Sequence, residues 1–173
     1  MGLEIERRFL VRTTAWQDLV RTSVHLSQGY ISASFHGVTT RVRHDHNQGW
    51  LTLKAPIVTA GAQPATAPIQ RWEFEYAIPL GDAQCLLEHC PHQLSKERYM
   101  LNLAGGDWLV DCFAGTNRGL VLAEVEMERS DASPGLPSWL GPEVSGDGRL
   151  SNAALARRPW NQWLEEEKQA LWQ

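Results

Sequence analysis

The sequence predicts an α+β protein built mainly of antiparallel β-sheet. Before Ser130, eight short segments are separated by turn-forming residues at a spacing that is typical of a barrel or a sandwich. In most of these segments charged side chains occupy every second position, which is the period of a strand. Helical periodicity is confined to one segment in the middle of the chain and to the part after Pro134.

The expected strands follow one another with short connections. They cover residues 3–12, 25–33, 38–45, 49–55, 69–78, 93–101, 107–113 and 119–129. The segment AGGD at 104–107 lies between two expected strands and indicates a hairpin connection. The segment TAGAQPATAP at 59–68 is rich in Ala, Pro and Gly, and it predicts a flexible loop inside one domain.

Helices are expected in two parts of the chain. The segment GDAQCLLEHC at 81–90 has helical periodicity, with Asp82 as its N-cap. Two further helices are expected over residues 151–157 and 159–171. The apolar stripe of the last helix would consist of Trp160, Trp163, Leu164 and Leu171. This stripe would cover the barrel wall or a tunnel mouth, or form a contact between two copies, so a monomer and a homodimer both stay open.

Length and composition limit the number of domains and the classes of function that this protein can have. The chain of 173 residues is long enough for one domain with a substantial core, so a single domain over residues 1–173 is expected. The formal net charge of −4 argues against a general nucleic-acid binder. No segment has the length and hydrophobicity of a membrane span, and no signal-peptide pattern is present, so a cytoplasmic protein without a membrane partner is expected.

Cysteine and histidine residues do not indicate a metal site or a disulfide. Cys85, Cys90 and Cys112 are an odd number without CxxC spacing, which favours free thiols. The tract HDH at 44–46 could in principle bind a metal, but it lies between two expected strands beside NQG at 47–49. A solvated hairpin turn is therefore the better interpretation.

Charge is segregated by strand and by face. Glu4, Glu6 and Arg8 share one face of the first strand, opposite Ile5 and Phe9. The same alternation gathers Arg41 with Arg43, Arg71 with Glu73 and Glu75, Lys96 with Arg98, and Glu124 with Glu126, and sets Lys54 opposite its leucines. A polar face turned to water is the commonest cause of such alternation. Two features argue against it here: several strands carry charges of one sign, and the opposite faces are rich in Trp, Phe, Leu and Val that need cover.

The charges would point inward if helices covered the apolar faces of a closed barrel. An interior of carboxylates and cations is unstable when empty and dry, so it predicts a wet tunnel that holds a charged ligand. Arginine and lysine favour a polyanion, and carboxylates can face a polyanion through a divalent metal. The pattern thus predicts that Mg²⁺ or Mn²⁺ lies between Glu4 and Glu6.

Several segments resemble, in the same order, the motifs of the CYTH superfamily, the triphosphate tunnel metalloenzymes. EIERRFLV resembles the N-terminal ExExK signature and QGYIS the QGY strand, and TRVRH, LTLKA and RWEFEY follow. SKERY, WLVDCFAG, LVLAEVEM and EVSGDGRLSNAALA resemble the later motifs, so the matched segments fall within residues 3–156. The resemblance implies an eight-stranded closed antiparallel β-barrel, the triphosphate tunnel, with helices packed outside and at the C-terminus.

The matched motifs also imply roles for individual residues. The metal ligands would be Glu4, Glu6, Asp111, Glu124 and Glu126. The phosphate path would be lined by Arg8, Arg41, Arg43, Lys54, Arg71, Lys96, Arg98 and Arg149. Tyr30 and Lys96 are the candidate catalytic side chains. Tyr30 would position or deprotonate the attacking water, and deprotonation requires that cations lower the pKa of its hydroxyl substantially from about 10.

Three positions depart from the family's motifs. Arg8 stands in place of the signature lysine, Gly148 where a basic residue is frequent, and Leu150 where an aromatic residue is common. Arg8 keeps the charge but changes reach and geometry, so a role that depends on lysine would be altered. Glu73 and Glu75 are expected to form ion pairs with tunnel arginines rather than to bind metal.

The implied function is hydrolysis of a linear triphosphate, with Mg²⁺ or Mn²⁺ as cofactor. Inorganic tripolyphosphate, converted to pyrophosphate and phosphate, is the favoured substrate among small polyanions. One alternative is a nucleotide enzyme, either a class IV-type adenylate cyclase or a thiamine or nucleoside triphosphatase. The other alternative is a non-catalytic module that binds polyphosphate without turnover.

Overall fold

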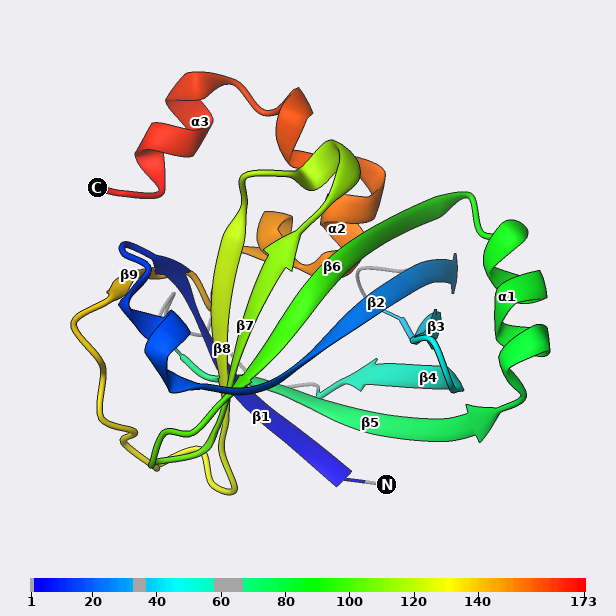
Figure 1. Cartoon of the computed structure of the whole chain (residues 1–173), viewed down its shortest axis with the longest axis horizontal. Coiled ribbons are helices and arrows are strands. Elements are labelled where there is room, and N and C mark those ends of the chain that lie inside the picture. Colours follow the sequence, from blue (N-terminus) through cyan, green and yellow to red (C-terminus); the bar gives the residue numbers. More distant parts are fainter. Residues whose placement is uncertain (1, 33–36, 58–66) are drawn as a thin grey trace.

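A computed structural model describes residues 2–32, 37–57 and 67–173 (Figure 1). Within these ranges the sheet consists of β1 (Gly2–Val11), β2 (Val20–Ser32), β3 (Thr39–His44), β4 (Gly49–Pro56), β5 (Ile69–Ile78), β6 (His92–Leu101), β7 (Asp107–Phe113), β8 (Val121–Glu126) and β9 (Leu140–Glu143). The helices are α1 (Leu80–Glu88), α2 (Asn152–Arg157) and α3 (Glu165–Ala170), with the 3₁₀ helices η1 (Ala15–Leu19), η2 (Gly115–Asn117), η3 (Gly148–Leu150) and η4 (Trp160–Gln162).

The sheet closes into a barrel because β1 pairs with a strand on each side. Residues 2–6 of β1 pair with β5, and residues 6–10 pair with β8. Eight antiparallel strands thereby form a ring in the order β1-β5-β4-β3-β2-β6-β7-β8. The predicted closed barrel is confirmed, and all eight expected strands are present with shifted ends. The largest shift is in β2, which begins at Val20 rather than at residue 25.

The ninth strand, β9, is absent from the sequence prediction. It pairs with β1 at Phe9 and Val11, beyond the part of β1 that pairs with β5. Its four residues, LGPE, show no alternation of apolar and polar side chains, and Pro142 has no N–H to donate. Such a segment forms a strand only because the edge of β1 is available for pairing. Its own sequence therefore gives little indication of a strand.

Helix α1 differs from its prediction at both ends. Pro79 is the N-cap, not Asp82, and Asp82 lies in the first turn of the helix. This position still suits an acidic side chain, because the N-terminal end of a helix carries partial positive charge. α1 packs outside the barrel against β3 and β4, where Ala83 and Val42 are fully buried in one cluster.

The prediction of a single helix over residues 159–171 is wrong. The chain forms η4, becomes extended at Trp163 and Leu164, and then forms α3. Glu167 stabilises the start of α3 by accepting a hydrogen bond from the Leu164 N–H at 2.9 Å. The break turns Trp163 into the protein, where it is buried, and leaves Leu164 58% exposed. Leu164 is therefore not part of the predicted apolar stripe.

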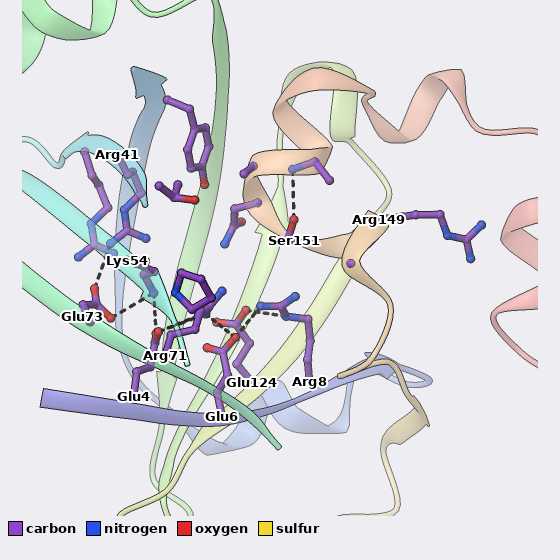
Figure 2. Close-up of a pocket in the computed structure, with 18 of the residues that line it drawn as sticks. Glu4, Glu6, Arg8, Arg41, Lys54, Arg71, Glu73, Glu124, Arg149 and Ser151 are labelled. Carbon is purple, nitrogen blue, oxygen red and sulfur yellow. Dashed lines mark hydrogen bonds and ion pairs between the residues drawn. The ribbon is translucent and has the colours of Figure 1, made fainter. Parts of the chain in front are cut away.

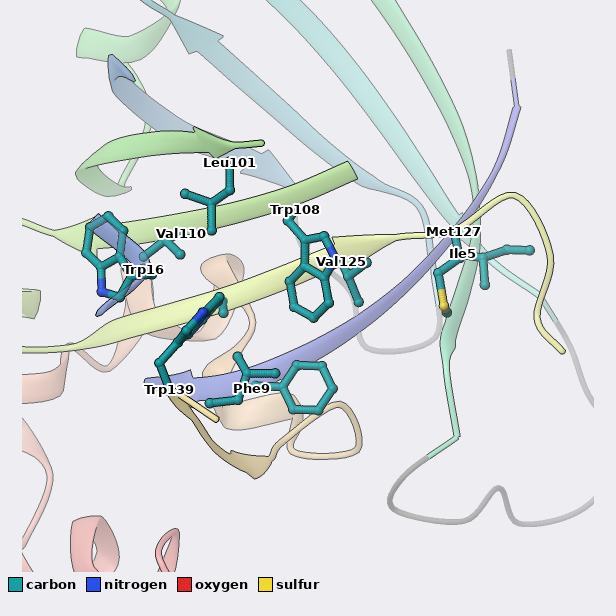
Figure 3. Packing of buried hydrophobic residues seen from close by; sticks show 11 residues of the cluster. Ile5, Phe9, Trp16, Leu101, Trp108, Val110, Val125, Met127 and Trp139 are labelled. Atoms are coloured by element: carbon teal, nitrogen blue, oxygen red, sulfur yellow. The ribbon is translucent and has the colours of Figure 1, made fainter. Parts of the chain in front are cut away.

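Two apolar clusters pack against opposite faces of the same strands. One covers the outside of β1, β7 and β8 and includes Trp16, Trp108 and Trp139, of which Trp139 packs edge-on against Trp108 (Figure 3). The other includes Leu10 and Leu122, which share the inner faces of β1 and β8 with the charged residues. It is completed by Leu94, Phe113, Leu120, Val144, Leu150, Leu155, Trp163 and Leu171. One end of the barrel interior is therefore apolar, and the charged residues occupy the rest.

The remaining local predictions agree with the structure where it describes them. The three cysteines are free. The HDH tract forms a hairpin turn in which the Asp45 carboxylate accepts hydrogen bonds from the N–H groups of Asn47 and Gln48. Gly105 and Gly106, both with positive φ, make the β6–β7 turn. Most of the predicted 59–68 loop lies outside the described residues.

Among the described helices, none combines the length and hydrophobicity that crossing a bilayer requires.

Candidate active site

A cavity of about 970 Å³ fills the charged part of the barrel interior (Figure 2). Most of the predicted site residues line it: Glu4, Glu6, Arg8, Tyr30, Arg41, Arg43, Lys54, Arg71, Arg98, Glu124, Glu126 and Arg149. Lys96 and Asp111 do not line it. The alternation of side chains along each strand therefore identified the inner face correctly. It did not show which inward side chains reach the cavity, because that depends on packing in the folded barrel.

The strand register places opposite charges side by side. Glu4 of β1 is paired with Arg71 of β5, and Arg98 of β6 with Asp111 of β7. Arg8 of β1 is likewise paired with Glu124 of β8, whereas Glu6 is paired with Glu126, so one pair of like charges lies directly across the β1–β8 ladder. Cross-strand pairs of opposite charge stabilise a sheet, whereas like charges at these positions would destabilise it.

A chain of ion pairs runs through the buried part of the wall. The Arg8 guanidinium contacts Glu6 at 2.7 Å and Glu124 at 3.0 Å. Arg98 joins the other oxygen of Glu124 at 3.0 Å to Asp111 at 2.7 Å. Burial alone would raise the pKa of Glu124, but Arg8 and Arg98 outweigh burial and hold this pKa far below its usual value. Glu124 therefore stays ionised, with both oxygens bound to arginine.

Lys96 and Asp111 form the innermost pair, and each side chain is 1% exposed. The Lys96 ammonium donates to Asp111 at 2.5 Å and to the Asn152 side chain at 3.3 Å. Burial and the nearby Arg98 lower the pKa of Lys96 to about 8, although Asp111 opposes this change. Both oxygens of Asp111 accept hydrogen bonds from cations. This contact set suits a residue that holds Lys96 and Arg98 in place, and the predicted metal and catalytic roles of the pair stay predictions.

The wall formed by β3, β4 and β5 is more open. Lys54 bridges Glu4 at 2.6 Å and Glu73 at 3.1 Å. Glu75 contacts Arg41 at 3.2 Å and Arg43 at 3.1 Å, and Glu73 is 3.5 Å from Arg41. The predicted ion pairs of these two glutamates with tunnel arginines are confirmed.

Two donors of this open wall lack a partner. The Nε–H groups of Arg41 and Arg43 are buried and have no hydrogen-bond acceptor among the described residues. Burial, together with Arg41, lowers the pKa of Arg43 to about 10. Buried polar groups are normally hydrogen-bonded. An anion in the cavity would supply the missing acceptors.

Three carboxylates converge at one side of the cavity. Glu4, Glu6 and Glu126 each offer an oxygen atom, and these atoms lie within 4.8 Å of one another. Burial, and after it the charge of Glu4, raises the pKa of Glu126 to about 7. Such a raised pKa indicates insufficient positive charge around the group. An all-oxygen set of carboxylates fits a hard divalent cation.

Arg71 is the positive group that lies between Glu4 and Glu6 in this structure. Its guanidinium is 3.1 Å from Glu4 and 2.9 Å from Glu6. The predicted metal at this place stays a prediction. Glu124, also an expected ligand, is not part of the convergent group, and its two oxygens accept hydrogen bonds from Arg8 and Arg98.

The pKa of Tyr30 is shifted away from the value that deprotonation of water would require. Burial raises the pKa of its hydroxyl to about 12, against the opposing effects of Arg41 and of the hydrogen bond from Gln28. The Gln28 side-chain amide donates to the Tyr30 oxygen at 2.7 Å. Tyr30 therefore keeps its proton and can donate a hydrogen bond, which suits positioning of a ligand rather than deprotonation of water.

The outer side of the cavity departs most from expectation. Arg149 points away from the charged wall toward the C-terminal segment (Figure 2) and forms an ion pair with Asp147 at 2.6 Å. Arg157, Arg158 and Trp163 also line the cavity and are missing from the predicted site. Helical spacing gives no sign that α2 lies against the cavity. Gln28, by contrast, could have been found, since it shares a strand face with Tyr30.

Comparisons with known proteins agree with this geometry. A family model described as the CYTH domain matches residues 2–158. The inorganic triphosphatase of Acetivibrio thermocellus is 36% identical over 167 residues, which cover 95% of this chain and 100% of that protein. The inorganic triphosphatase of Nitrosomonas europaea is 32% identical over 157 residues, which cover 88% of this chain and 96% of that protein. A solved structure of an inorganic triphosphatase matches with a TM-score of 0.62 and 32% identity, over 90% of this chain and 95% of that one. The chain belongs to the CYTH domain family.

Proposed function

We propose that this protein is a divalent-metal-dependent triphosphatase that hydrolyses inorganic tripolyphosphate to pyrophosphate and phosphate. The observation that carries the proposal is the convergence of Glu4, Glu6 and Glu126 at the side of a cavity whose other walls present arginine and lysine. A metal-binding carboxylate group facing a cationic surface suits a polyphosphate chain. The relatives named inorganic triphosphatase support the same reaction.

Arginines of the open wall are the proposed phosphate donors. The unpaired Nε–H groups of Arg41 and Arg43 supply donors in a fixed planar arrangement, which matches phosphate oxygens. Lys54 adds a third cation that lines the same cavity. These groups would orient the chain and stabilise the negative charge on the leaving pyrophosphate.

Glu4, Glu6 and Glu126 are the proposed ligands of Mg²⁺ or Mn²⁺. A divalent cation held there would neutralise phosphate oxygens and activate water for attack on phosphorus. The carboxylate of Glu126 must lose its proton to serve as a ligand, which a pKa of about 7 permits near neutral pH. Tyr30, with its proton retained, would orient a phosphate oxygen or the attacking water by donating a hydrogen bond.

The cavity wall favours an inorganic chain over a nucleotide. Among the described residues, Tyr30 and Trp163 are the aromatic side chains that line it. The ring of Trp163 is 4% exposed and lies under the guanidinium groups of Arg149 and Arg158. Tyr30 is 5% exposed, so among the described residues a purine finds no free aromatic face on which to stack.

Product analysis tests the proposal. Purified protein is supplied in turn with tripolyphosphate, ATP and thiamine triphosphate, each with Mg²⁺ and with Mn²⁺. We expect phosphate release from tripolyphosphate to be fastest, and to fall by at least about 100-fold in Glu4→Gln and Glu126→Gln, because each loses a ligand charge. Calorimetric titration with Mn²⁺ should show weakened metal binding in both variants.

Glu128→Gln is the matched control, because Glu128 follows Glu126 by two residues but is exposed and does not line the cavity. It should retain wild-type turnover. Cyclic AMP from ATP would instead identify a cyclase. Tight binding of tripolyphosphate without any turnover would identify a binding module, and either result would overturn the proposal.

A further inference from the structure

Cations of the protein itself neutralise two members of the convergent carboxylate group, which consists of Glu4, Glu6 and Glu126. One oxygen of Glu4 accepts from Lys54 at 2.6 Å, and the other lies 3.1 Å from Arg71. One oxygen of Glu6 lies 2.7 Å from Arg8 and 2.9 Å from Arg71. Arg71 thus joins two members of the group, whereas Lys54 and Arg8 each contact one of them (Figure 2).

A divalent ion and the Arg71 guanidinium cannot share the place between Glu4 and Glu6. Carboxylate oxygens bind Mg²⁺ at about 2.0–2.1 Å. An ion held by both glutamates would therefore lie close to the Arg71 nitrogen that contacts the same two side chains, and like charges at such a distance repel strongly. Arginine cannot relieve the repulsion by losing its proton. The guanidinium must therefore leave the carboxylates when an ion binds there.

The surroundings of Arg71 allow it to leave, and those of its neighbours do not. Arg71 lines the cavity and is 26% exposed, whereas Arg8 is 4% exposed and is held by Glu124 as well as by Glu6. Lys54 keeps a second partner, Glu73, at 3.1 Å. A displaced Arg71 side chain turns into the cavity, where a phosphate chain would offer it oxygen atoms as acceptors.

We propose that Arg71 is an internal counter-ion that couples the two ligands of the site: a divalent ion displaces its guanidinium from Glu4 and Glu6, and a phosphate chain accepts it. This inference rests on the proposed triphosphatase function and specifies how that site is regulated. An ion alone leaves Arg71 without an anion, and a chain that takes Arg71 leaves the glutamates with less positive charge. Bound together, the two ligands compensate both losses.

The exchange makes metal and phosphate chain bind with positive cooperativity. Each ligand raises the affinity for the other by the same factor, because coupling between two binding equilibria is reciprocal. Direct contact between the ion and phosphate oxygens contributes to the same factor. Removal of Arg71 separates the two contributions, since it abolishes the exchange and retains the direct contact.

Calorimetric titration with Mn²⁺ measures the coupling without turnover. Mn²⁺ is added to the protein alone, and then to protein saturated with a tripolyphosphate analogue whose bridging oxygens are replaced by NH groups that resist hydrolysis. In Arg71→Gln we expect the Kd for Mn²⁺ of the protein alone to fall about tenfold, because the competing charge is gone. The Kd measured with the analogue should stay near the wild-type value. The ratio of the two Kd values, which is the coupling factor, should therefore fall about tenfold.

Two further variants make this result specific. Arg7→Gln removes the same charge from the outer face of β1, where Arg7 contacts Glu143 at 2.6 Å and does not line the cavity. Both of its Kd values should equal those of the wild type. Arg71→Lys retains a positive charge that opposes the ion, so its coupling factor should lie between those of the wild type and Arg71→Gln. This variant decides the question if Arg71→Gln does not fold.

The outcomes separate this inference from the proposed function. Unchanged or weaker binding of Mn²⁺ to Arg71→Gln alone, or a wild-type coupling factor in both Arg71 variants, would overturn the counter-ion role. If wild-type protein still releases phosphate from tripolyphosphate and Glu4→Gln does not, the hydrolase stands and only the counter-ion role fails. Tighter Mn²⁺ binding by Arg71→Gln in a protein that does not turn over tripolyphosphate would overturn only the hydrolase.

Discussion

The two walls of the tunnel carry the same kinds of side chains in different surroundings. On β1, β6, β7 and β8 most of the ionised side chains that face inward are almost completely buried: exposure is 3% for Glu6, 4% for Arg8, 6% for Glu124, and 1% for Lys96 and Asp111, while Arg98 is 15% exposed. On β4 and β5, Lys54, Glu73 and Glu75 are 15–31% exposed. The two walls thus carry the same types of charged side chain, but the side chains of β4 and β5 are more accessible to water.

Packing behind the strands accounts for the difference. The buried wall has an apolar cluster on its outer side that includes Trp16, Trp108 and Trp139. The open wall turns Trp72 and Tyr76 of β5 outward, and these side chains are 45% and 56% exposed. The wall behind which this cluster packs holds its charges in fixed mutual pairs. On the open wall α1 covers the outer faces of β3 and β4, β5 stays exposed, and Arg41 and Arg43 of β3 retain buried donors without acceptors among the described residues, so it is the wall prepared for a ligand.

The largest expected effect is loss of a charge from the buried wall. Asp111→Asn keeps the shape of the side chain but leaves the buried Lys96 without its counter-charge, and Arg98 keeps only its contact with Glu124. We expect the free energy of unfolding to fall by about 3–5 kcal/mol. Urea denaturation followed by circular dichroism measures it. A loss below about 1 kcal/mol would show that the two walls are energetically equivalent.

Replacement of Arg8 by lysine should have the next largest effect. One ammonium cannot maintain the contacts that the Arg8 guanidinium makes with Glu6, Glu124 and the Leu150 carbonyl oxygen. We expect a loss of about 1–3 kcal/mol in the free energy of unfolding. Arg7→Lys is the control on the outer face of the same strand, where the side chain is 18% exposed. Equal losses would remove the distinction between the faces.

For Glu126 we expect an intermediate effect on stability, and this effect depends on pH. Its pKa is raised from 4.5 to about 7 in the folded protein. The folded state therefore binds a proton that the unfolded state has lost between about pH 4.5 and 7, and metal-free protein should become less stable as pH rises through this window. Denaturation midpoints measured in EDTA should show this slope in the wild type. Glu126→Gln should abolish the slope and Glu128→Gln should retain it, and a slope unchanged by Glu126→Gln would contradict the assignment.

The smallest change in stability is expected on the open wall. Glu75→Gln removes the charge that partly neutralises Arg41 and Arg43. Because this group is in contact with water, we expect the free energy of unfolding to change by no more than about 1 kcal/mol. The freed arginines should lower KM for tripolyphosphate. A rise in KM with lost stability would indicate that Glu75 instead holds the arginines in their binding geometry.

Much of the site could be predicted because strand periodicity is local. Alternation within EIERRF and RWEFEY is enough to assign Glu4, Glu6 and Arg71 to one face. Placement of Arg71 between the two glutamates depends on the β1–β5 register, which joins residues far apart in the chain. Lys96 and Asp111 have the same alternation as their neighbours but lie too deep to reach the cavity.

Other features escaped prediction where long-range contacts override local preference. The periodicity of residues 159–171 is helical, yet burial of Trp163 is gained only by breaking the helix. β9 depends on the free edge of β1 beyond the part that β5 covers. The pKa of Tyr30 depends on how completely the hydroxyl is buried, and the sequence around it shows only that cations share its cavity.

The sequence by itself determined the strands, the charged inner face, and the family to which these motifs belong, because each of these depends on the order and spacing of residues along the chain. The tertiary structure decided which carboxylates converge, which cations are already paired, and how far the cavity extends. The physical reason is that pairing, desolvation and pKa depend on distances between side chains and on their exposure to water. Strand register and helix docking set both quantities.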